Sequence, residues 1–217
     1  MNLAEIISTT RDWLNLGEDV YPDSVVTSWV RMAEEFLSEG IRCKHMIQWD
    51  EAILTSDNMV ELPKDWLELD LVMIPDKRPL EYASQYEFYD PDLYNDGRYT
   101  IVGNFIVVKP IETTGTHVRI AYYQQIPPVG NEEGQHSWLF DVYPRLGTLA
   151  VLMTAGMYAI EDARTPMWEK NVMDQATLIN ARHQESKSRG SKLISRQQPS
   201  WRNSHAKSRT SWRNSGT

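Results

Sequence analysis

The 217-residue chain has a single cysteine, and its last 32 residues contain no acidic residue. One cysteine, Cys43, excludes an intramolecular disulfide framework and a cysteine-based zinc site. No apolar run approaches the roughly 18 residues that a membrane-spanning helix needs. The N-terminal segment carries acidic residues and no apolar stretch, which argues against a signal peptide. We therefore expect a soluble protein that is made in a reducing compartment and has no contact with a membrane.

Charge is unevenly divided along the chain. The formal net charge is −8, but residues 1–185 carry −16 and residues 186–217 carry +8. The chain also has eight tryptophans and ten tyrosines, which favour a well-packed core or large interfaces. We expect an acidic folded body, residues 1–185, followed by a basic extension, residues 186–217.

Two helices are predicted within residues 2–40. Asn2 and Glu5 form a capping-box pattern, and apolar residues follow at helical spacing up to Gly17. Pro22 suits the first turn of the second helix, which we expect to end at Gly40. The apolar stripe predicted for this second helix is Val25, Trp29, Met32, Ala33, Phe36 and Leu37.

A β-rich insertion is predicted for residues 45–125. Alternating or β-branched runs bounded by turn residues indicate strands at 46–54, 59–62, 67–74, 98–102, 104–109 and 117–125. Ser84 is a suitable cap for a short helix within 82–89. The predicted fold class is α+β: a helical hairpin and long C-terminal helices, an inserted small antiparallel β-region, and an extended C-terminal arm.

Long helices are predicted for residues 138–185, starting after Ser137. Pro144 must lie in the first turns or divide the helix. The stretch 146–160 carries no charge, so we expect it to be buried nearly all round, in part by a second subunit. The predicted subunit-interface residues are Leu146, Leu149, Met153 and Met157. After Pro166 a final helix is expected through Ile179, fraying over Arg182–Ser188.

The basic extension contains one internal repeat. Ser200-Trp201-Arg202-Asn203-Ser204 recurs as Ser211-Trp212-Arg213-Asn214-Ser215. Tryptophan and arginine are the residues that most often anchor interfaces. Extended at about 3.3 Å per residue, 32 residues reach roughly 100 Å, so the extension could dock on a distant partner. Single-stranded nucleic acid is the alternative partner, because the extension combines cations with tryptophans that can stack on bases.

No catalytic or metal-binding motif stands out. The five histidines are scattered and never lie three or four residues apart. Asp90, Asp92 and Asp96 resemble a calcium loop only faintly, since no closing glutamate follows. Glu132 and Glu133 near His136 are more readily explained as a solvated loop. Cys43 is expected to be a structural cysteine. We therefore predict no catalytic residue, no metal site, no cofactor and no enzymatic activity, with a small hydrolase as the enzyme alternative.

Two segments carry a family resemblance. Residues 61–67 read Glu-Leu-Pro-Lys-Asp-Trp-Leu, and residues 97–110 contain the pattern Gly-Arg-Tyr-x-Ile-x-Gly-Asn-x-Ile-x-Val-x-Pro. Together with the Tyr21-Pro22-Asp23 helix entry, the 118–123 strand and the long helix at 140–162, the layout resembles the head-to-tail connector, or adaptor, proteins of tailed bacteriophages. The similarity spans about 1–185.

The resemblance implies a structural virion protein. Such adaptors form a twelve-fold ring, a dodecamer, beneath the portal vertex, and their C-terminal arm commonly reaches up the portal. The implied partners are the portal protein, the tail nozzle or tail-tube proteins, and genomic DNA that passes through the channel on ejection without sequence-specific binding. The implied location is the neck of the virion, after synthesis in the host cytoplasm. The predicted portal-binding residues of the arm are Arg196, Trp201, Arg202, Arg209, Trp212 and Arg213.

Overall fold

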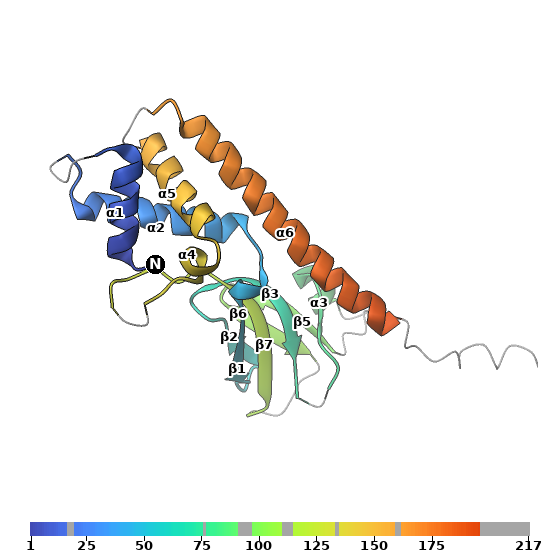
Figure 1. Cartoon of the computed structure of the whole chain (residues 1–217). Helices are drawn as coiled ribbons and strands as arrows, with labels where there is room; N and C mark the ends of the chain where they lie inside the picture. The colour runs from blue at the N-terminus through green and yellow to red at the C-terminus, as the bar shows by residue number, and fades with distance from the viewer. Residues whose placement is uncertain are drawn as a thin grey trace, which may run out of the picture. The chain divides into compact units, whose positions relative to one another are not determined.

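A computed structural model describes residues 1–16, 20–75, 77–90, 97–109, 115–132, 135–158 and 162–195. The chain divides into two units, Met1–Asn180 and Ala181–Thr217, and the long helix α6 (Thr165–Ser195) contributes to both. In the first unit, α1, α2, α4 and α5 gather at one end and the strands at the other, with the short α3 beside the strands (Figure 1). The predicted α+β class is confirmed.

The N-terminal hairpin consists of α1 (Leu3–Leu14) and α2 (Asp23–Gly40). The predicted capping box is present, with Glu5 donating its backbone N–H to Asn2 at 2.8 Å and Asn2 donating its own to the Glu5 carboxylate at 3.0 Å. Pro22 lies just before α2, whose backbone N–H groups at Val25 and Val26 donate to the Pro22 carbonyl. Local sequence signals therefore define the start of both helices.

Pro144 divides the next predicted helix. Its ring cannot continue the hydrogen-bond ladder, so α4 (Trp138–Val142) ends before it and α5 (Pro144–Tyr158) begins at it. The two helices pack closely at Gly147, where an added Cβ would lie 2.7 Å from the Phe140 ring. The expected burial of 146–160 holds only in part. α5 is buried over Leu149–Ala155 against the chain's own α1, α2 and α4, but Met157 and Tyr158 in its last turn are 50% and 69% exposed.

Two sheets form the strand-rich end. The first has the order β1-β7-β3 and is antiparallel throughout, and the second has the order β2-β6-β5-β4. The strands are β1 (Ile47–Ile53), β2 (Met59–Glu61), β3 (Trp66–Met73), β4 (Glu81–Tyr82), β5 (Arg98–Val102), β6 (Phe105–Lys109) and β7 (His117–Gln124). The short β4 pairs with β5 in parallel, which the sequence pattern did not predict. A 3-10 turn (Lys44–Met46) leads into β1, and α3 (Gln85–Tyr89) follows its predicted cap Ser84.

Two hydrophobic cores support these layers. One lies among the helices and includes Trp29, Leu37, Phe140, Leu152 and Trp168. The other lies between the two sheets and includes Leu62, Val72, Ile106, Ile120 and Tyr122. The strand β7 joins them, because Tyr123 packs in the helical core while its neighbour Tyr122 packs between the sheets.

One predicted boundary is wrong. The final helix does not fray over Arg182–Ser188, because α6 runs unbroken to Ser195. Glu185 and Arg189, one turn apart, form an ion pair that supports this part of the helix. Most residues of 181–189 are good helix formers, so the helix needs no apolar periodicity to continue.

Candidate functional site

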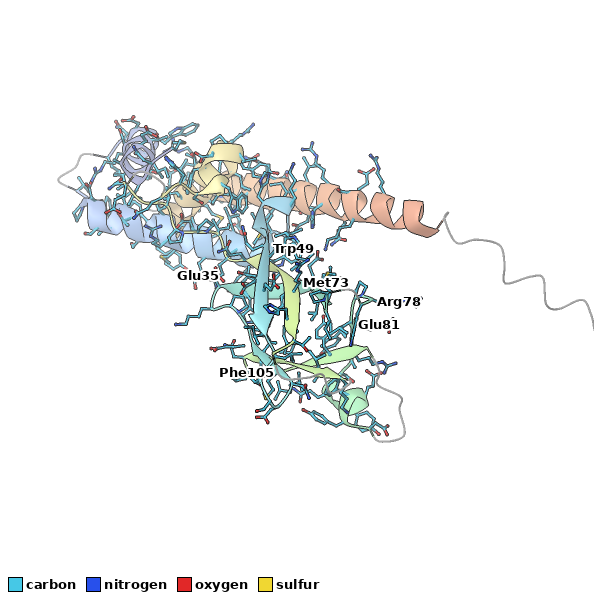
Figure 2. All side chains as sticks on the ribbon, turned by 90° about the horizontal axis from the view of Figure 1, so that it is seen from below. Glu35, Trp49, Met73, Arg78, Glu81 and Phe105 are labelled. Carbon is cyan, nitrogen blue, oxygen red and sulfur yellow. The ribbon has the colours of Figure 1, made fainter. Side chains whose placement is uncertain are left out.

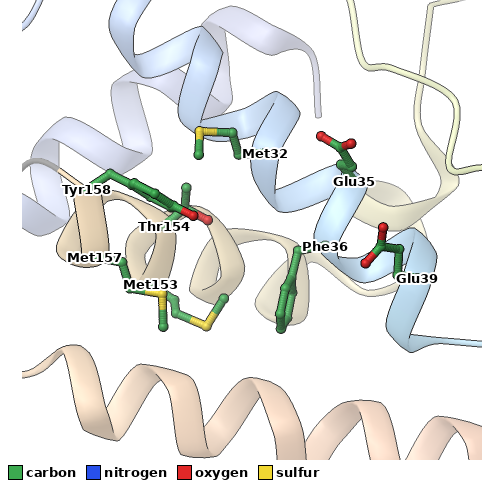
Figure 3. Close-up of a pocket in the computed structure, with 8 residues that line it drawn as sticks. All are labelled: Met32, Glu35, Phe36, Glu39, Met153, Thr154, Met157 and Tyr158. Atoms are coloured by element: carbon green, nitrogen blue, oxygen red, sulfur yellow. The ribbon is translucent and has the colours of Figure 1, made fainter.

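A surface hollow of about 210 Å³ lies between α2 and α5 (Figure 3). We call it the acidic hollow. Its lining combines two carboxylates with apolar side chains: Met32, Glu35, Phe36 and Glu39 from α2, and Met153, Thr154, Met157 and Tyr158 from α5. Phe36 is 38% exposed and Met157 is 50% exposed. The hollow therefore leaves apolar surface uncovered in the single chain.

The hollow exists because α2 is rotated relative to the predicted stripe. Trp29, Ala33 and Leu37 of the predicted stripe are buried, but so are Val26, Val30, Glu34 and Ser38 on the adjoining side of the helix. Met32 is half-buried and Phe36 is exposed, although both were expected in the core. Glu35 and Glu39 are exposed one helical turn apart, and among the described residues no ion pair reaches either carboxylate. Like charges at this spacing weaken an isolated helix by about 0.2–0.5 kcal/mol. A cation placed between them would relieve that repulsion.

A second hollow of about 480 Å³ lies among α1, α5 and α6. We call it the tryptophan hollow. Its apolar lining includes Trp13, Leu149, Leu152, Met167 and Trp168, and its one charged lining residue is Arg145. Trp13 is 53% exposed and Met167 is 54% exposed. Like the acidic hollow, the tryptophan hollow therefore exposes more apolar surface than the solvent-facing side of a helix usually does.

The four predicted interface residues fall in different places. Leu146 is 1% exposed and is held in the core by the chain's own helices. Leu149 lines the tryptophan hollow, and Met153 and Met157 line the acidic hollow. Only Met157 is open to a neighbouring molecule over much of its surface. The interface role of these four residues stays a prediction.

A buried polar cluster fixes the segment between β7 and α4. The Glu34 carboxylate accepts the backbone N–H of Val129 at 2.8 Å and a hydrogen bond from Arg31 at 2.7 Å. Arg31 also donates to the Val129 carbonyl at 2.6 Å, and the Ser38 hydroxyl accepts the Ile126 N–H at 3.0 Å. Burial raises the pKa of Glu34, and these hydrogen bonds oppose that rise. The cluster thus holds α2 against the segment before α4.

The two segments that carry the family resemblance meet in the structure. Leu62 donates its backbone N–H to the Asn104 carbonyl at 2.9 Å, and Gly103 turns the chain there with φ +61°. Asp65 accepts hydrogen bonds from Tyr122 and Gln124 of β7. Burial, together with the nearby Asp65 carboxylate, raises the pKa of Tyr122 to about 12. The 61–67 segment therefore joins the two sheets, while the 97–110 segment supplies β5 and β6, whose Tyr99, Ile106 and Val108 pack in the core between the sheets.

The small-hydrolase alternative would use Glu132, Glu133 or the acids of residues 90–96. Where these residues are described, they make local hydrogen bonds. Glu132 accepts a hydrogen bond from the Gln135 side chain at 2.8 Å. Asp90 is the residue that follows α3, and its backbone N–H donates to the Tyr86 carbonyl at 3.1 Å. Glu133, Asp92 and Asp96 lie outside the described residues. Within the described chain, no group of three or more His, Cys, Asp or Glu could hold a metal ion.

Cys43 is buried, as predicted for a structural cysteine. Burial raises the pKa of its thiol, and hydrogen bonds from the backbone of His45 and Met46, together with the charge of Lys44, offset this rise only in part. A reactive cysteine needs the opposite shift, toward the thiolate. The side chain therefore belongs to the helical core, where it packs with Met46 and Ile41 as a small apolar residue.

The predicted arm residues lie beyond the described part of the chain. Arg196, Trp201, Arg202, Arg209, Trp212 and Arg213 all follow Ser195, the last residue of α6. Their role stays a prediction. Among the described residues, no helix is long and apolar enough to cross a membrane.

The family model described as SU10 adaptor protein matches residues 1–203. The chain belongs to this family. The match includes all elements described above and the first Trp-Arg unit, Trp201-Arg202, but it ends before the second unit at Trp212-Arg213. No match to the chain was found among curated proteins.

Membership in the SU10 adaptor family identifies a structural adaptor protein of bacteriophages. Members are associated with portal and tail proteins, and their place is the neck of the virion. The resemblance that the two sequence segments indicated is thereby confirmed. What the segments contribute is architectural, since one joins the two sheets of the first unit and the other supplies β5 and β6.

Proposed function

We propose that this SU10 adaptor forms an oligomeric ring that joins the portal to the tail and lets DNA pass. The observation that carries the proposal is the family match over residues 1–203. The two uncovered hollows beside α5 support self-association, because each leaves apolar surface in water that a neighbouring subunit would bury. A twelve-fold ring is the symmetry that the adaptor resemblance implies.

The charge of the first 185 residues suits a DNA channel. These residues carry a net −16, which repels the phosphates of a passing duplex and provides few cations for phosphate contacts. DNA would therefore slide through the ring without sequence-specific binding. No cofactor and no catalytic step enters this function. Nozzle or tail-tube proteins would attach to the ring on the side away from the portal.

The basic extension serves as the portal-binding arm in this proposal. The last 22 residues, which follow α6, include two Trp-Arg units and no acid. Fully extended, they span at most roughly 75 Å, enough to contact a separate protein. Each tryptophan would insert into an apolar pocket of the portal, and each adjacent arginine would pair with an acid beside it. Arg196 and Arg209 would add further charge contacts.

The test is portal binding by truncated chains. Deleting residues 196–217 should abolish co-purification with the portal, while circular dichroism of the remaining helices and strands stays unchanged. A shorter deletion, 204–217, keeps Trp201 and Arg202 and should leave part of the affinity. The paired variants Trp201→Ala with Arg202→Ala and Trp212→Ala with Arg213→Ala compare the two units directly. Undiminished portal binding after the longer deletion would contradict the arm assignment.

A further inference from the structure

The two hollows lie on opposite sides of the same helix. Leu149 and Leu152 of α5 line the tryptophan hollow, whereas Met153 and Met157 line the acidic hollow. Arg145 and Thr148 also line the tryptophan hollow, and Thr154 and Tyr158 also line the acidic hollow. Successive residues of an α-helix are about 100° apart, so the mean directions of these two full sets differ by roughly 160°, close to half a turn. A subunit thus presents two different uncovered surfaces on its two sides, with α5 between them.

The two surfaces are complementary in charge. The acidic hollow has the carboxylates of Glu35 and Glu39 on its rim, and Figure 3 shows them on successive turns of α2. The tryptophan hollow has the guanidinium of Arg145, which is exposed and has no ion pair among the described residues. Each hollow combines these charges with half-exposed apolar side chains. Two copies of the same hollow facing each other would oppose like charges.

We infer that the tryptophan hollow of one copy docks on the acidic hollow of the next copy. Arg145 pairs with Glu35 and Glu39 across the contact, while Trp13 and Met167 cover Phe36 and Met157 of the neighbour. A contact between two different surfaces is head-to-tail, and repeated contacts of this kind close into a ring when the rotation permits. The inference rests on the proposed ring and specifies which side chains build its subunit contact.

Charge reversal tests the pairing. The full-length variants Glu35→Lys with Glu39→Lys, and separately Arg145→Glu, should each raise the concentration needed for assembly by about tenfold or more, because like charges then face each other. Combining all three substitutions in one chain recreates opposite charges and should restore assembly. Sedimentation velocity, with and without portal, gives the mass of each assembly. The control variant is Glu61→Lys with Glu81→Lys, which makes the same change in charge on exposed residues of the strands. Glu81 lies far from Glu35 (Figure 2), so this variant should assemble like wild type.

The apolar part of the contact has its own variant. Trp13 is half exposed, so Trp13→Ala should leave the thermal unfolding midpoint nearly unchanged and still weaken assembly about tenfold. Trp49→Ala is the matched control, since Trp49 is 59% exposed and lies outside both hollows. Comparing Trp13→Ala with Trp49→Ala tests the contact even if a charge-reversal variant folds poorly.

The outcomes separate this contact from the proposed function. If wild type assembles while the Glu35/Glu39 variant or Trp13→Ala assembles at the same concentration, the contact is wrong and the adaptor ring stands. If the single-sided charge variants lose assembly and the variant with all three substitutions does not regain it, Arg145 does not pair with these glutamates and the contact is wrong. If wild type stays monomeric both alone and with the portal, the proposed ring fails and this contact falls with it.

Discussion

The backbone N–H of Val129 donates a hydrogen bond of 2.8 Å to the carboxylate of Glu34, a buried acid on α2. The two residues are 95 positions apart in sequence. Arg31 completes the arrangement by donating both to Glu34 and to the Val129 carbonyl. This cluster fixes how the segment leaving β7 approaches the helices, and α4 and α5 follow directly from it.

Substitution of Glu34 should therefore change stability in two distinguishable ways. Glu34→Ala leaves the buried Val129 N–H without an acceptor and should cost about 1–3 kcal/mol in the free energy of unfolding. Glu34→Gln keeps an acceptor oxygen and should cost less. Urea unfolding at pH 7, followed by circular dichroism, measures both. Equal losses for the two variants would show that the hydrogen bond to Val129 contributes little.

The same residue gives a pH dependence of defined sign. Burial raises the pKa of Glu34 above its ordinary value, so the folded chain binds the proton more tightly than the unfolded chain. The contribution of Glu34 to stability is then largest below its ordinary pKa and is lost as the pH rises through the folded-state pKa. Relative to Glu34→Gln, wild type should gain stability as the pH falls from 7 toward the ordinary pKa of a glutamate. An unchanged difference, or one of opposite sign, would contradict the shift.

Cys43 should react slowly with thiol reagents in the native protein. It is 3% exposed, and burial raises the pKa of its thiol, so little thiolate is accessible at pH 8. Labelling with a chromogenic disulfide reagent should be at least about a hundredfold faster in denaturant than in buffer. Equally rapid labelling of native protein would place Cys43 at the surface and reopen a reactive role for it.

Gly147 should be difficult to replace. A Cβ there would lie 2.7 Å from the buried Phe140 ring, so Gly147→Ala forces α4 and α5 apart and should cost about 1–3 kcal/mol. Gly40→Ala is the matched control, because a Cβ at Gly40 would meet nothing within 4 Å. The control should be neutral or stabilising by up to about 1 kcal/mol. Thermal unfolding of both variants checks this, and equal effects would contradict the close α4–α5 packing.

Much of the fold could be predicted because its signals are local. Asn2, Ser84 and Pro144 define helix ends through caps or a missing N–H, and the structure has helix ends at these positions. The strands of the insertion were predicted to within one or two residues at each end, since prolines and turn residues bound them. The parallel β4–β5 pair was missed because two residues are too short to show an alternating pattern.

The candidate site was harder to predict because it depends on the rotation of α2. Met32 and Phe36 read as core residues by apolarity, but the core instead contains Glu34 and Ser38. Val26, Val30, Glu34 and Ser38 follow one another at intervals of four residues, and this spacing was the sequence signal for the buried face of α2. The burial of Glu34 and Ser38 is favourable only because Val129 and Ile126 supply hydrogen bonds from distant sequence. No local pattern contains that information.

The proposed ring is decided by the mass of the purified full-length protein, alone and mixed with its portal, in analytical ultracentrifugation. A subunit has a mass of 25.1 kDa. We predict a closed oligomer, formed either by the protein alone or when the portal is added. A stable 25.1 kDa monomer whose sedimentation does not change with the portal would contradict it.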